Sequence, residues 1–315
     1  MKILVVGPGA VGCLFAARFR KAGYDATLLD YRPERADRIS REGIRIEGIL
    51  GEYRVEVPVV TPETPSRPDL ALICVKSNQT RQAAEEIADW LPADGRVLTL
   101  QNGLGNFEVL QEVFGAERVL GGITAEGATV LGPGRIRHAG RGDTVIGPDS
   151  GGDETIERIA EAFRQAGFAV RTAERVDQLI WGKLIVNVGI NALTALLRVK
   201  NGRLPNLPTV VRLMDDLVRE AVAVASARGI DLPYPDPLGR VMEVCRATAD
   251  NVASMLQDVL KQRPTEVAHI NGAIVREGER CGVPTPVNRA LTWLVQGLEN
   301  SYTERVPDPP ASTGE

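Results

Sequence analysis

A glycine-rich turn directly after the first apolar segment restricts the fold of this chain more than any other feature. Lys2–Val6 is a β-branched apolar run typical of a buried strand. The segment GPGAVG follows at once, a helical pattern runs from about Ala10 to Lys21, and Ala26–Asp30 predicts a second strand. A GxGxxG turn between a strand and a helix, within a unit of about 30 residues, is typical of dinucleotide-binding domains.

The three glycines of the turn each meet a requirement of that fold. Gly7 permits the tight turn, Gly9 lets the backbone approach a pyrophosphate, and Gly12 allows close packing of helix against strand. The helix N-terminus offers free N–H groups and the positive end of its dipole to phosphates. A glycine turn without a ligand is the alternative. The turn residues expected to bind a cofactor are Gly7, Pro8, Gly9, Ala10, Val11 and Gly12.

The end of the second strand carries the residues that bear on the choice of cofactor. An acid at the position of Asp30 normally binds the ribose 2′-hydroxyl of NAD. Arg32 and Arg35 follow, and arginine there suits the 2′-phosphate of NADP. A helix cap or a surface residue is the alternative for Asp30. These residues leave the preference between NADPH and NADH open.

The alternation of strands and helices continues to about residue 172 and then stops. With 315 residues, the chain exceeds the ~250–300 at which a single core stops growing. We therefore expect an α/β fold with a doubly wound, Rossmann-type parallel sheet at residues 1–173. An all-helical domain for substrate binding and dimerisation is expected at residues 174–305, followed by a disordered tail at 306–315.

Within these domains, Val119–Pro148 predicts two or three strands. Asp153–Ala166 is the last helix predicted in the first domain. The helices predicted in the second domain are Val176–Leu197, Pro208–Arg228, Pro237–Gln262, Thr265–Cys281 and Pro286–Ser301.

Composition excludes several classes of protein. The net charge of −4, from 37 basic and 41 acidic residues, gives no broad basic surface for nucleic acid or an anionic membrane. The four cysteines form no CxxC pair and no metal-ligand spacing with the two histidines, so we expect no metal.

No signal peptide precedes the glycine turn, and no apolar run reaches the ~18 residues of a membrane span. These patterns predict a cytoplasmic protein.

A polar stripe on an otherwise apolar helix follows the predicted domain boundary. Lys183, Asn187 and Asn191 are spaced i, i+4 and i+8, so they share one helix face. The chain has only six lysines, and a buried ammonium is costly without partners. Burial can lower the pKa of a lysine toward the working pH, which suits a general acid. A lysine that snorkels from a core helix is the alternative.

A third polar group lies further along the helical half. Asn251 and Ser254 are spaced i, i+3 and are expected to share a helix face. Glu266 precedes another predicted helix, where a stabilising charge at a helix N-terminus is the alternative role. Asn271 and Gly272 are poor helix formers. We expect Gly272 to allow close packing and Asn271 to bond to another helix.

Six sequence blocks together resemble the ketopantoate reductase (2-dehydropantoate 2-reductase) family, over nearly the whole chain to about Thr303. The blocks are GPGAVG (7–12), VKS (75–77), QNG (101–103), GKLIVNVGIN (182–191), DNVASMLQD (250–258) and TEVAHING (265–272). The last three are much more specific than the glycine turn. The resemblance implies an N-terminal dinucleotide-binding domain and a helical domain like that of 6-phosphogluconate dehydrogenase.

The resemblance also implies a reaction and its residues. The reaction is hydride transfer from NADPH to the C2 ketone of ketopantoate, giving pantoate for pantothenate and coenzyme A synthesis. Lys183 matches the family's general acid, Glu266 its essential carboxylate, and Lys76 a lysine beside the cofactor. Positions around nicotinamide and substrate match Asn102, Asn187, Asn191, Asn251 and Ser254. Together with Asp30 and Arg32 from the end of the second strand, Lys76 and Asn102 complete the cofactor set expected beyond the turn.

Other functions remain open at this stage. Many family members lack an acid at the position of Asp30, so its presence keeps NADH possible beside NADPH. A related reductase of another 2-oxo acid fits the same motifs. A non-catalytic dinucleotide-binding module would not need both Lys183 and Glu266, and a sugar-phosphate dehydrogenase would need more basic phosphate ligands. A homodimer is the default assembly.

Overall fold

The computed structural model describes residues 1–148 and 155–304, and its contacts divide the chain into two units. The first unit is Met1–Lys183, and the second begins at Leu184. This division falls inside the helix Asp177–Leu197. The predicted tail at 306–315 and the first residues of the helix predicted from Asp153 lie outside the described residues.

The larger sheet of the first unit has eight strands in the order β12-β11-β8-β7-β6-β1-β2-β5. Its strands are β1 (Lys2–Val6), β2 (Asp25–Leu29), β5 (Val59–Val60), β6 (Leu70–Ile73), β7 (Arg96–Thr99), β8 (Val119–Thr124), β11 (Thr144–Gly147) and β12 (Val170–Thr172). The six strands from β5 to β8 are parallel, and β11 runs antiparallel to β8. The order reverses between β1 and its neighbours β2 and β6, as in doubly wound sheets.

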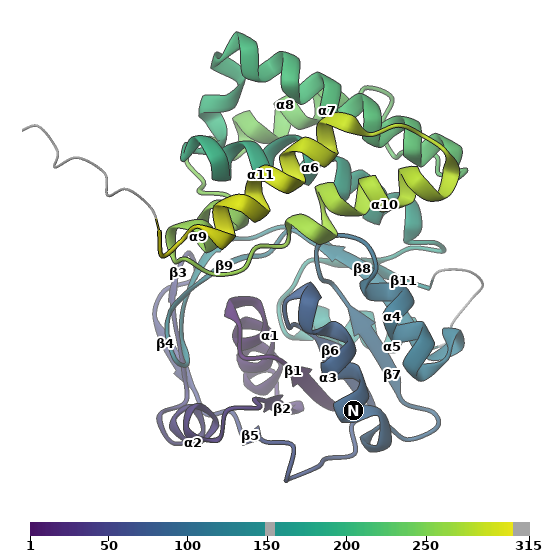
Figure 1. The fold of residues 1–315 in the computed structure, drawn as a ribbon. Helices are drawn as coiled ribbons and strands as arrows, with labels where there is room; N and C mark the ends of the chain where they lie inside the picture. The colour runs from purple at the N-terminus through teal and green to yellow at the C-terminus, as the bar shows by residue number, and fades with distance from the viewer. Residues whose placement is uncertain (149–154, 305–315) are drawn as a thin grey trace, which may run out of the picture. The chain divides into compact units, whose positions relative to one another are not determined.

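Helices cover both faces of this sheet, as the doubly wound prediction requires (Figure 1). They are α1 (Ala10–Lys21), α2 (Pro33–Glu42), α3 (Thr80–Ile87), α4 (Asn106–Phe114) and α5 (Ile156–Gln165), with short 3-10 turns η1 (Ser77–Gln79), η2 (Ala88–Trp90) and η3 (Ala116–Arg118).

Alternate residues of β1 pack into different cores, one on each face of the sheet. Ile3 and Val5 pack with α1 and α5, whereas Leu4 and Val6 pack with α3 and α4. The buried, non-alternating pattern of Lys2–Val6 is explained by these two cores.

A second, four-stranded sheet was not predicted. It has the order β4-β3-β10-β9, with β3 (Ile44–Gly48), β4 (Tyr53–Val55), β9 (Gly127–Gly132) and β10 (Arg135–Gly140). The expectation of two or three strands in Val119–Pro148 is wrong, because that segment holds four, β8 to β11. β3 and β10 are parallel although about 90 residues separate them, as in the pair Ile46 with Ile136. Single-sequence patterns carry no information about such a long-range pairing.

The described part of the second unit is helical. Its elements are the remainder of α6 (Asp177–Leu197), η4 (Asn201–Asn206), α7 (Pro208–Ala227), α8 (Pro237–Ala247), α9 (Ser254–Leu260), η5 (Val267–His269), α10 (Asn271–Cys281) and α11 (Pro286–Asn300). By length and composition, α6 could cross a membrane, but 67% of its apolar window is buried in the protein. Its polar stripe at Lys183, Asn187 and Asn191 also fits a core helix better than a lipid-exposed one.

The single helix predicted at Pro237–Gln262 is wrong, because the chain leaves the helix between α8 and α9. The backbone N–H groups of Asn201 and Gly202, in η4, donate to the carbonyls of Asn251 and Ala249 at 3.1 Å each. The Asn201 side chain also donates to Thr248 Oγ1 at 2.9 Å. Backbone acceptors that a continuous helix would use internally are therefore taken by η4.

Candidate active site

The glycine turn has the geometry that a dinucleotide phosphate needs. Gly7 adopts φ +110°, and a Cβ on Gly12 would lie 2.0 Å from the carbonyl oxygen of Gly7. No side chain caps the N-terminus of α1 at Gly9, and no acidic residue lies in its first turn. The first-turn N–H groups of a helix lack intrahelical acceptors. The turn therefore presents free donors and a positive dipole end, and it fits a pyrophosphate.

The carboxyl ends of the parallel strands bring several predicted residues to one edge of the sheet. β1 ends at the glycine turn, β2 just before Asp30, and β6 shortly before Lys76. β7 leads to Asn102, and β8 ends at Thr124. Ligands of open α/β sheets bind at this edge, beside the reversal of strand order. The first unit thus gathers its predicted cofactor residues at the edge where open α/β sheets bind their ligands.

Asp30 is not a surface residue, and both of its carboxylate oxygens already accept hydrogen bonds. Its residue is 0% exposed, and Arg35 clamps both carboxylate oxygens, with Nε to Oδ2 at 2.5 Å and Nη2 to Oδ1 at 2.7 Å. The backbone N–H of Arg32 also donates to Oδ1 at 2.9 Å. Hydrogen bonding to Asp30 raises the pKa of the Arg35 guanidinium. The pair is neutral, whereas the exposed Arg32 side chain adds a positive charge beside it.

A network of four polar side chains joins the VKS and QNG blocks, and sequence analysis did not assign these residues a role. The Gln101 amide donates to the carbonyl of Val75 at 2.7 Å and to Thr80 Oγ1 at 2.9 Å. Asn106 accepts from Thr80 Oγ1 at 2.8 Å and donates to Ser77 Oγ at 3.1 Å. Both Ser77 and Asn106 then donate to the carbonyl oxygen of Asn102, at 3.1 and 3.0 Å. Polar residues directly after two neighbouring strands were the available signal.

The Asn102 backbone is fixed by these two bonds, while its side chain stays partly exposed at the sheet edge. Lys76 is also partly exposed and directly precedes η1. The network therefore holds the loops after β6 and β7 in one arrangement and leaves both predicted ligands accessible.

Lys183 lies at the same edge of the sheet as the glycine turn. It is partly buried on α6, and its Nζ donates to the carbonyl oxygen of Thr124 at 2.8 Å. Thr124 is the last residue of β8 and is 8% exposed. A hydrogen bond to a carbonyl restricts the ammonium to one direction, which a lysine that only snorkels to solvent would not need.

The other two members of the stripe lie on the part of α6 that belongs to the second unit. Asn187 is partly buried and Asn191 is 6% exposed, so α6 is helical over the whole predicted stripe. Helix packing explains why the block GKLIVNVGIN contains a glycine, Gly189. A Cβ there would lie 2.8 Å from Val241 Cγ1 of α8 and 3.4 Å from Val218 of α7. Gly189 therefore allows the close packing of these three helices.

Asn251 and Ser254 do not share a helix face, so that expectation is wrong. Asn251 lies in the connection between α8 and α9, whereas Ser254 is the first residue of α9. Both are exposed. The break in the helix, imposed by the hydrogen bonds from η4, places the two side chains at the start of α9 instead of along its side.

Glu266 is 8% exposed and precedes η5, where its side chain makes no capping bond. Asn271 begins α10, which explains how two poor helix formers are tolerated. As expected, Asn271 bonds to other helices, donating to Asn288 Oδ1 of α11 at 3.0 Å and to the Val188 carbonyl of α6 at 3.4 Å.

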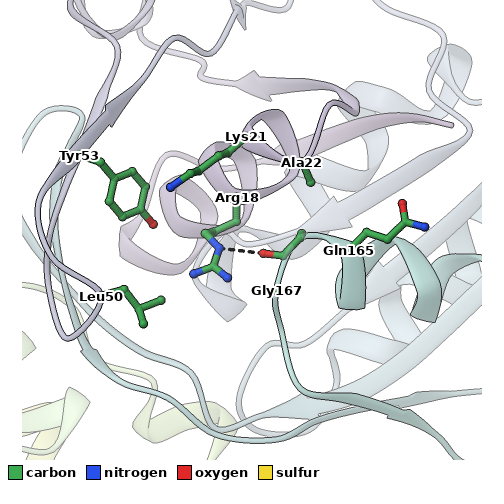
Figure 2. Close-up of a pocket in the computed structure, with 8 residues that line it drawn as sticks. Arg18, Lys21, Ala22, Leu50, Tyr53, Gln165 and Gly167 are labelled. Atoms are coloured by element: carbon green, nitrogen blue, oxygen red, sulfur yellow. Dashed lines mark hydrogen bonds between the residues drawn. The ribbon is translucent and has the colours of Figure 1, made fainter.

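A separate cavity of about 400 Å³ in the first unit involves none of the predicted site residues (Figure 2). Arg18 and Lys21, near the C-terminal end of α1, line it with Tyr53 and Leu50. Arg18 Nε donates to the Ala166 carbonyl at 2.8 Å, and Lys21 Nζ lies 4.2 Å from the centre of the Tyr53 ring. These cations already have partners, at the end of α1 opposite to the glycine turn.

The described residues contain no group of three or more His, Cys, Asp or Glu suited to a metal ion.

Burial raises the pKa of the Cys13 thiol to about 12 and that of the Cys245 thiol to about 11. Such thiols stay protonated and unreactive at neutral pH, so both cysteines serve as small apolar residues of the core.

Comparison with known proteins decides the family. The family model described as ketopantoate reductase PanE/ApbA matches residues 3–151, and the model of the ketopantoate reductase PanE/ApbA C terminus matches residues 175–299. The chain belongs to the ketopantoate reductase family. The resemblance inferred from the six sequence blocks is thereby confirmed.

Relatives of this ketopantoate reductase family member match over almost its whole length. A 2-dehydropantoate 2-reductase of Halobacterium salinarum is 38% identical over 300 residues, covering 94% of this chain and 98% of the relative. That of Pyrococcus abyssi is 34% identical, covering 95% and 98%.

Solved structures share the fold. The PanE/ApbA family ketopantoate reductase of Ralstonia eutropha has a TM-score of 0.87 at 33% identity, covering 96% of this chain and 99% of that one. A D-mandelate dehydrogenase in complex with NADH and anilino(oxo)acetate has a TM-score of 0.88 at 28% identity, with the same coverage. The predicted α/β fold with a C-terminal helical domain is confirmed.

Proposed function

We propose that this protein is a 2-dehydropantoate 2-reductase that uses NADPH to reduce the C2 ketone of ketopantoate to pantoate. Family membership makes it an oxidoreductase that acts on a ketone. Pantoate feeds the synthesis of pantothenate and coenzyme A, and a cytoplasmic location goes with that role. One observation carries the proposal: the hydrogen-bonded Lys183 ammonium at the sheet edge that bears the glycine turn.

Lys183 is the general acid of the proposed reaction. The nicotinamide supplies the hydride when it is bound. Negative charge builds on the ketone oxygen as the C2 carbon is reduced, and a positioned ammonium stabilises that charge and then donates its proton. The bond from Nζ to the Thr124 carbonyl uses one of three ammonium protons and fixes the direction of the side chain.

The helical unit supplies the proposed substrate ligands. The proposed ligands of the ketopantoate carboxylate and hydroxyl are the side chains of Asn187, Asn191, Asn251 and Ser254. Amides and hydroxyls can donate hydrogen bonds to a carboxylate, and they can both donate to and accept from a hydroxyl. Glu266, a nearly buried carboxylate, orients the reacting groups or binds the substrate hydroxyl. Asn102 binds at the nicotinamide end of the cofactor, and Lys76 binds beside it. These roles are carried over from the family's motif positions.

The preference for NADPH is supported by the state of Asp30. An unpaired carboxylate would repel a 2′-phosphate, but Arg35 neutralises Asp30 through two charge-assisted bonds. Arg32 is exposed next to this pair and offers a guanidinium to the phosphate. NADH remains usable, because an unphosphorylated ribose is uncharged and the paired Asp30 and Arg35 do not repel it.

We expect Arg32→Ala to lower kcat/KM for NADPH roughly 10-fold or more, because one charge-assisted contact to the 2′-phosphate is lost. The value for NADH should stay within about twofold. Arg38→Ala is the matched control on α2, the helix that follows Arg32, since Arg38 pairs with Glu42 at an exposed site and should change neither value. Equal losses with NADPH and NADH would contradict a role for Arg32 at the phosphate.

A reductase of another 2-oxo acid is the second candidate. The structural relative that binds NADH and anilino(oxo)acetate is a D-mandelate dehydrogenase, so this fold accommodates aryl substrates and NADH. Initial rates with ketopantoate, pyruvate and an aryl 2-oxo acid separate the candidates. We expect the highest kcat/KM with ketopantoate. Cofactor binding without reduction of any of them would instead indicate a non-catalytic dinucleotide-binding module.

A homodimer is the assembly we propose. Trp293 and Leu294 on α11 are 64% and 57% exposed, and adjacent large apolar side chains are common at protein interfaces. We expect Trp293→Arg to shift the protein toward the monomer in sedimentation velocity experiments. Arg289→Ala, one helical turn away in an exposed pair with Glu279, should leave the assembly unchanged. A wild-type monomer at micromolar concentration would overturn the proposal.

A further inference from the structure

A buried glutamate–histidine pair lies where the chain passes from one sheet of the first unit to the other. Glu126 stands between β8 of the larger sheet and β9 of the smaller one, and His138 lies in β10. His138 Nε2 and Glu126 Oε2 are 2.6 Å apart, and each side chain is 1% exposed. Neither residue has a role in the reaction proposed above.

Stability alone does not account for this pair. Glu126 Oε1 and His138 Nδ1 are buried, and neither has a hydrogen-bond partner among the described residues. Leaving a buried polar atom unpaired is costly, and well-packed apolar side chains of similar size would avoid that cost. A buried polar pair kept at such a cost calls for another explanation.

The pair is connected to Lys183 through the backbone of Thr124. The N–H of Glu126 donates to Thr124 Oγ1 at 3.2 Å, and this hydroxyl is 2.8 Å from Thr144 Oγ1 of β11. The N–H of Ala125 donates to the Asp143 carbonyl at 2.9 Å. The carbonyl oxygen of the same Thr124 accepts the bond from Lys183 Nζ at 2.8 Å. One short turn therefore carries both the Lys183 acceptor and the buried carboxylate.

We propose that Glu126 and His138 form a positioning pair for Lys183. His138 anchors the Glu126 side chain to β10, and the turn from Thr124 to Glu126 is thereby tied to both sheets. The Thr124 carbonyl then stays where it directs the ammonium. The inference rests on the proposed role of Lys183, because fixing a general acid matters only if small misplacements slow the reaction.

The first test measures the Lys183 amine directly, without turnover. Acetylation of the full-length protein with a limiting amount of acetic anhydride, followed by peptide mass spectrometry, gives the relative reactivity of each lysine. Four exposed lysines serve as internal references: Lys2, Lys21, Lys200 and Lys261. We expect the reactivity of Lys183 to rise about fivefold in Glu126→Ala and in His138→Ala, because the ammonium is released from its carbonyl. Unchanged Lys183 reactivity in both variants would overturn the inference.

A conservative variant separates positioning from folding. His138→Gln keeps an N–H donor near the place of Nε2, so Lys183 reactivity should return to within about twofold of the wild type. Comparable thermal unfolding midpoints for His138→Gln and His138→Ala, with different Lys183 reactivity, would support positioning. If Lys183 reactivity follows only the unfolding midpoint, the pair is merely structural and the inference fails.

A double-mutant cycle provides the kinetic test. Glu126→Ala should lower kcat about 10-fold in the wild-type background, with an unchanged Kd for NADPH, and have no further effect in the Lys183→Ala background. An equal loss in both backgrounds would overturn positioning through Lys183. If Lys183→Ala alone leaves kcat unchanged, the proposed function is wrong, whereas the acetylation result still decides whether the pair holds the amine.

Discussion

Replacing Lys183 by alanine is expected to lower kcat for ketopantoate reduction by ~10²–10⁴-fold, the usual contribution of a positioned general acid. The Kd for NADPH should change by less than about threefold, because the glycine turn and the Asp30–Arg35 pair do not involve this side chain. Stopped-flow measurement of NADPH oxidation with saturating substrate gives kcat, and fluorescence titration gives the cofactor Kd.

The effect of Lys183 has two controls. Lys200→Ala removes another lysine whose exposed pair with Asp250, at 3.2 Å, is worth little. Its kcat should remain within about twofold of the wild type. Small alkylamines added to Lys183→Ala should restore part of the rate, because they can supply the missing ammonium. Near-normal turnover of Lys183→Ala without added amine would exclude the general-acid role.

Gly9→Ala should weaken cofactor binding about 100-fold, or about 2.8 kcal/mol, without destabilising the protein. Gly9 has φ −70° and ψ −179°, which alanine adopts without strain, and a Cβ there would lie 3.7 Å from the Cys74 carbonyl oxygen. The added methyl group finds room in the protein but occupies the approach of a pyrophosphate to the turn. Isothermal titration with NADPH and a thermal unfolding scan measure the two quantities.

Two further glycines complete that test. A Cβ on Gly12 would lie 2.0 Å from the Gly7 carbonyl oxygen, so Gly12→Ala should lower both cofactor affinity and the unfolding midpoint. A Cβ on Gly132 would meet nothing within 4 Å, and Gly132→Ala should change neither. Unchanged NADPH affinity in Gly9→Ala would contradict phosphate binding at this turn.

The parts of the fold that depend on local pattern could be predicted from the sequence. Ala10–Lys21 is a helix with the expected bounds, because the glycine turn precedes it and Gly23 lies just after its end. The parts set by distant partners could not be predicted. β3 pairs with β10 far along the chain, and η4 breaks the helix predicted at Pro237–Gln262.

The candidate site divides in the same way. The glycine turn could be found from its spacing, and Lys183 from its polar stripe together with the family resemblance of its sequence block. The structure places both at the carboxyl edge of one sheet. The pairing of Asp30 with Arg35 could not be predicted, because an i, i+5 contact across a turn has no distinctive spacing. Glu126 and His138 were missed for a similar reason, since β9 and β10 were not predicted to form a hairpin.

Isotope transfer shows directly whether this protein moves a hydride from NADPH to the C2 carbon of ketopantoate. The protein is incubated with ketopantoate and NADPH that carries deuterium at both C4 positions of the nicotinamide, and the product is examined by mass spectrometry and proton NMR. We expect pantoate with one deuterium, located at C2, formed in an amount equal to the NADPH oxidised. Pantoate without deuterium at C2, or oxidation of NADPH without formation of pantoate, would contradict it.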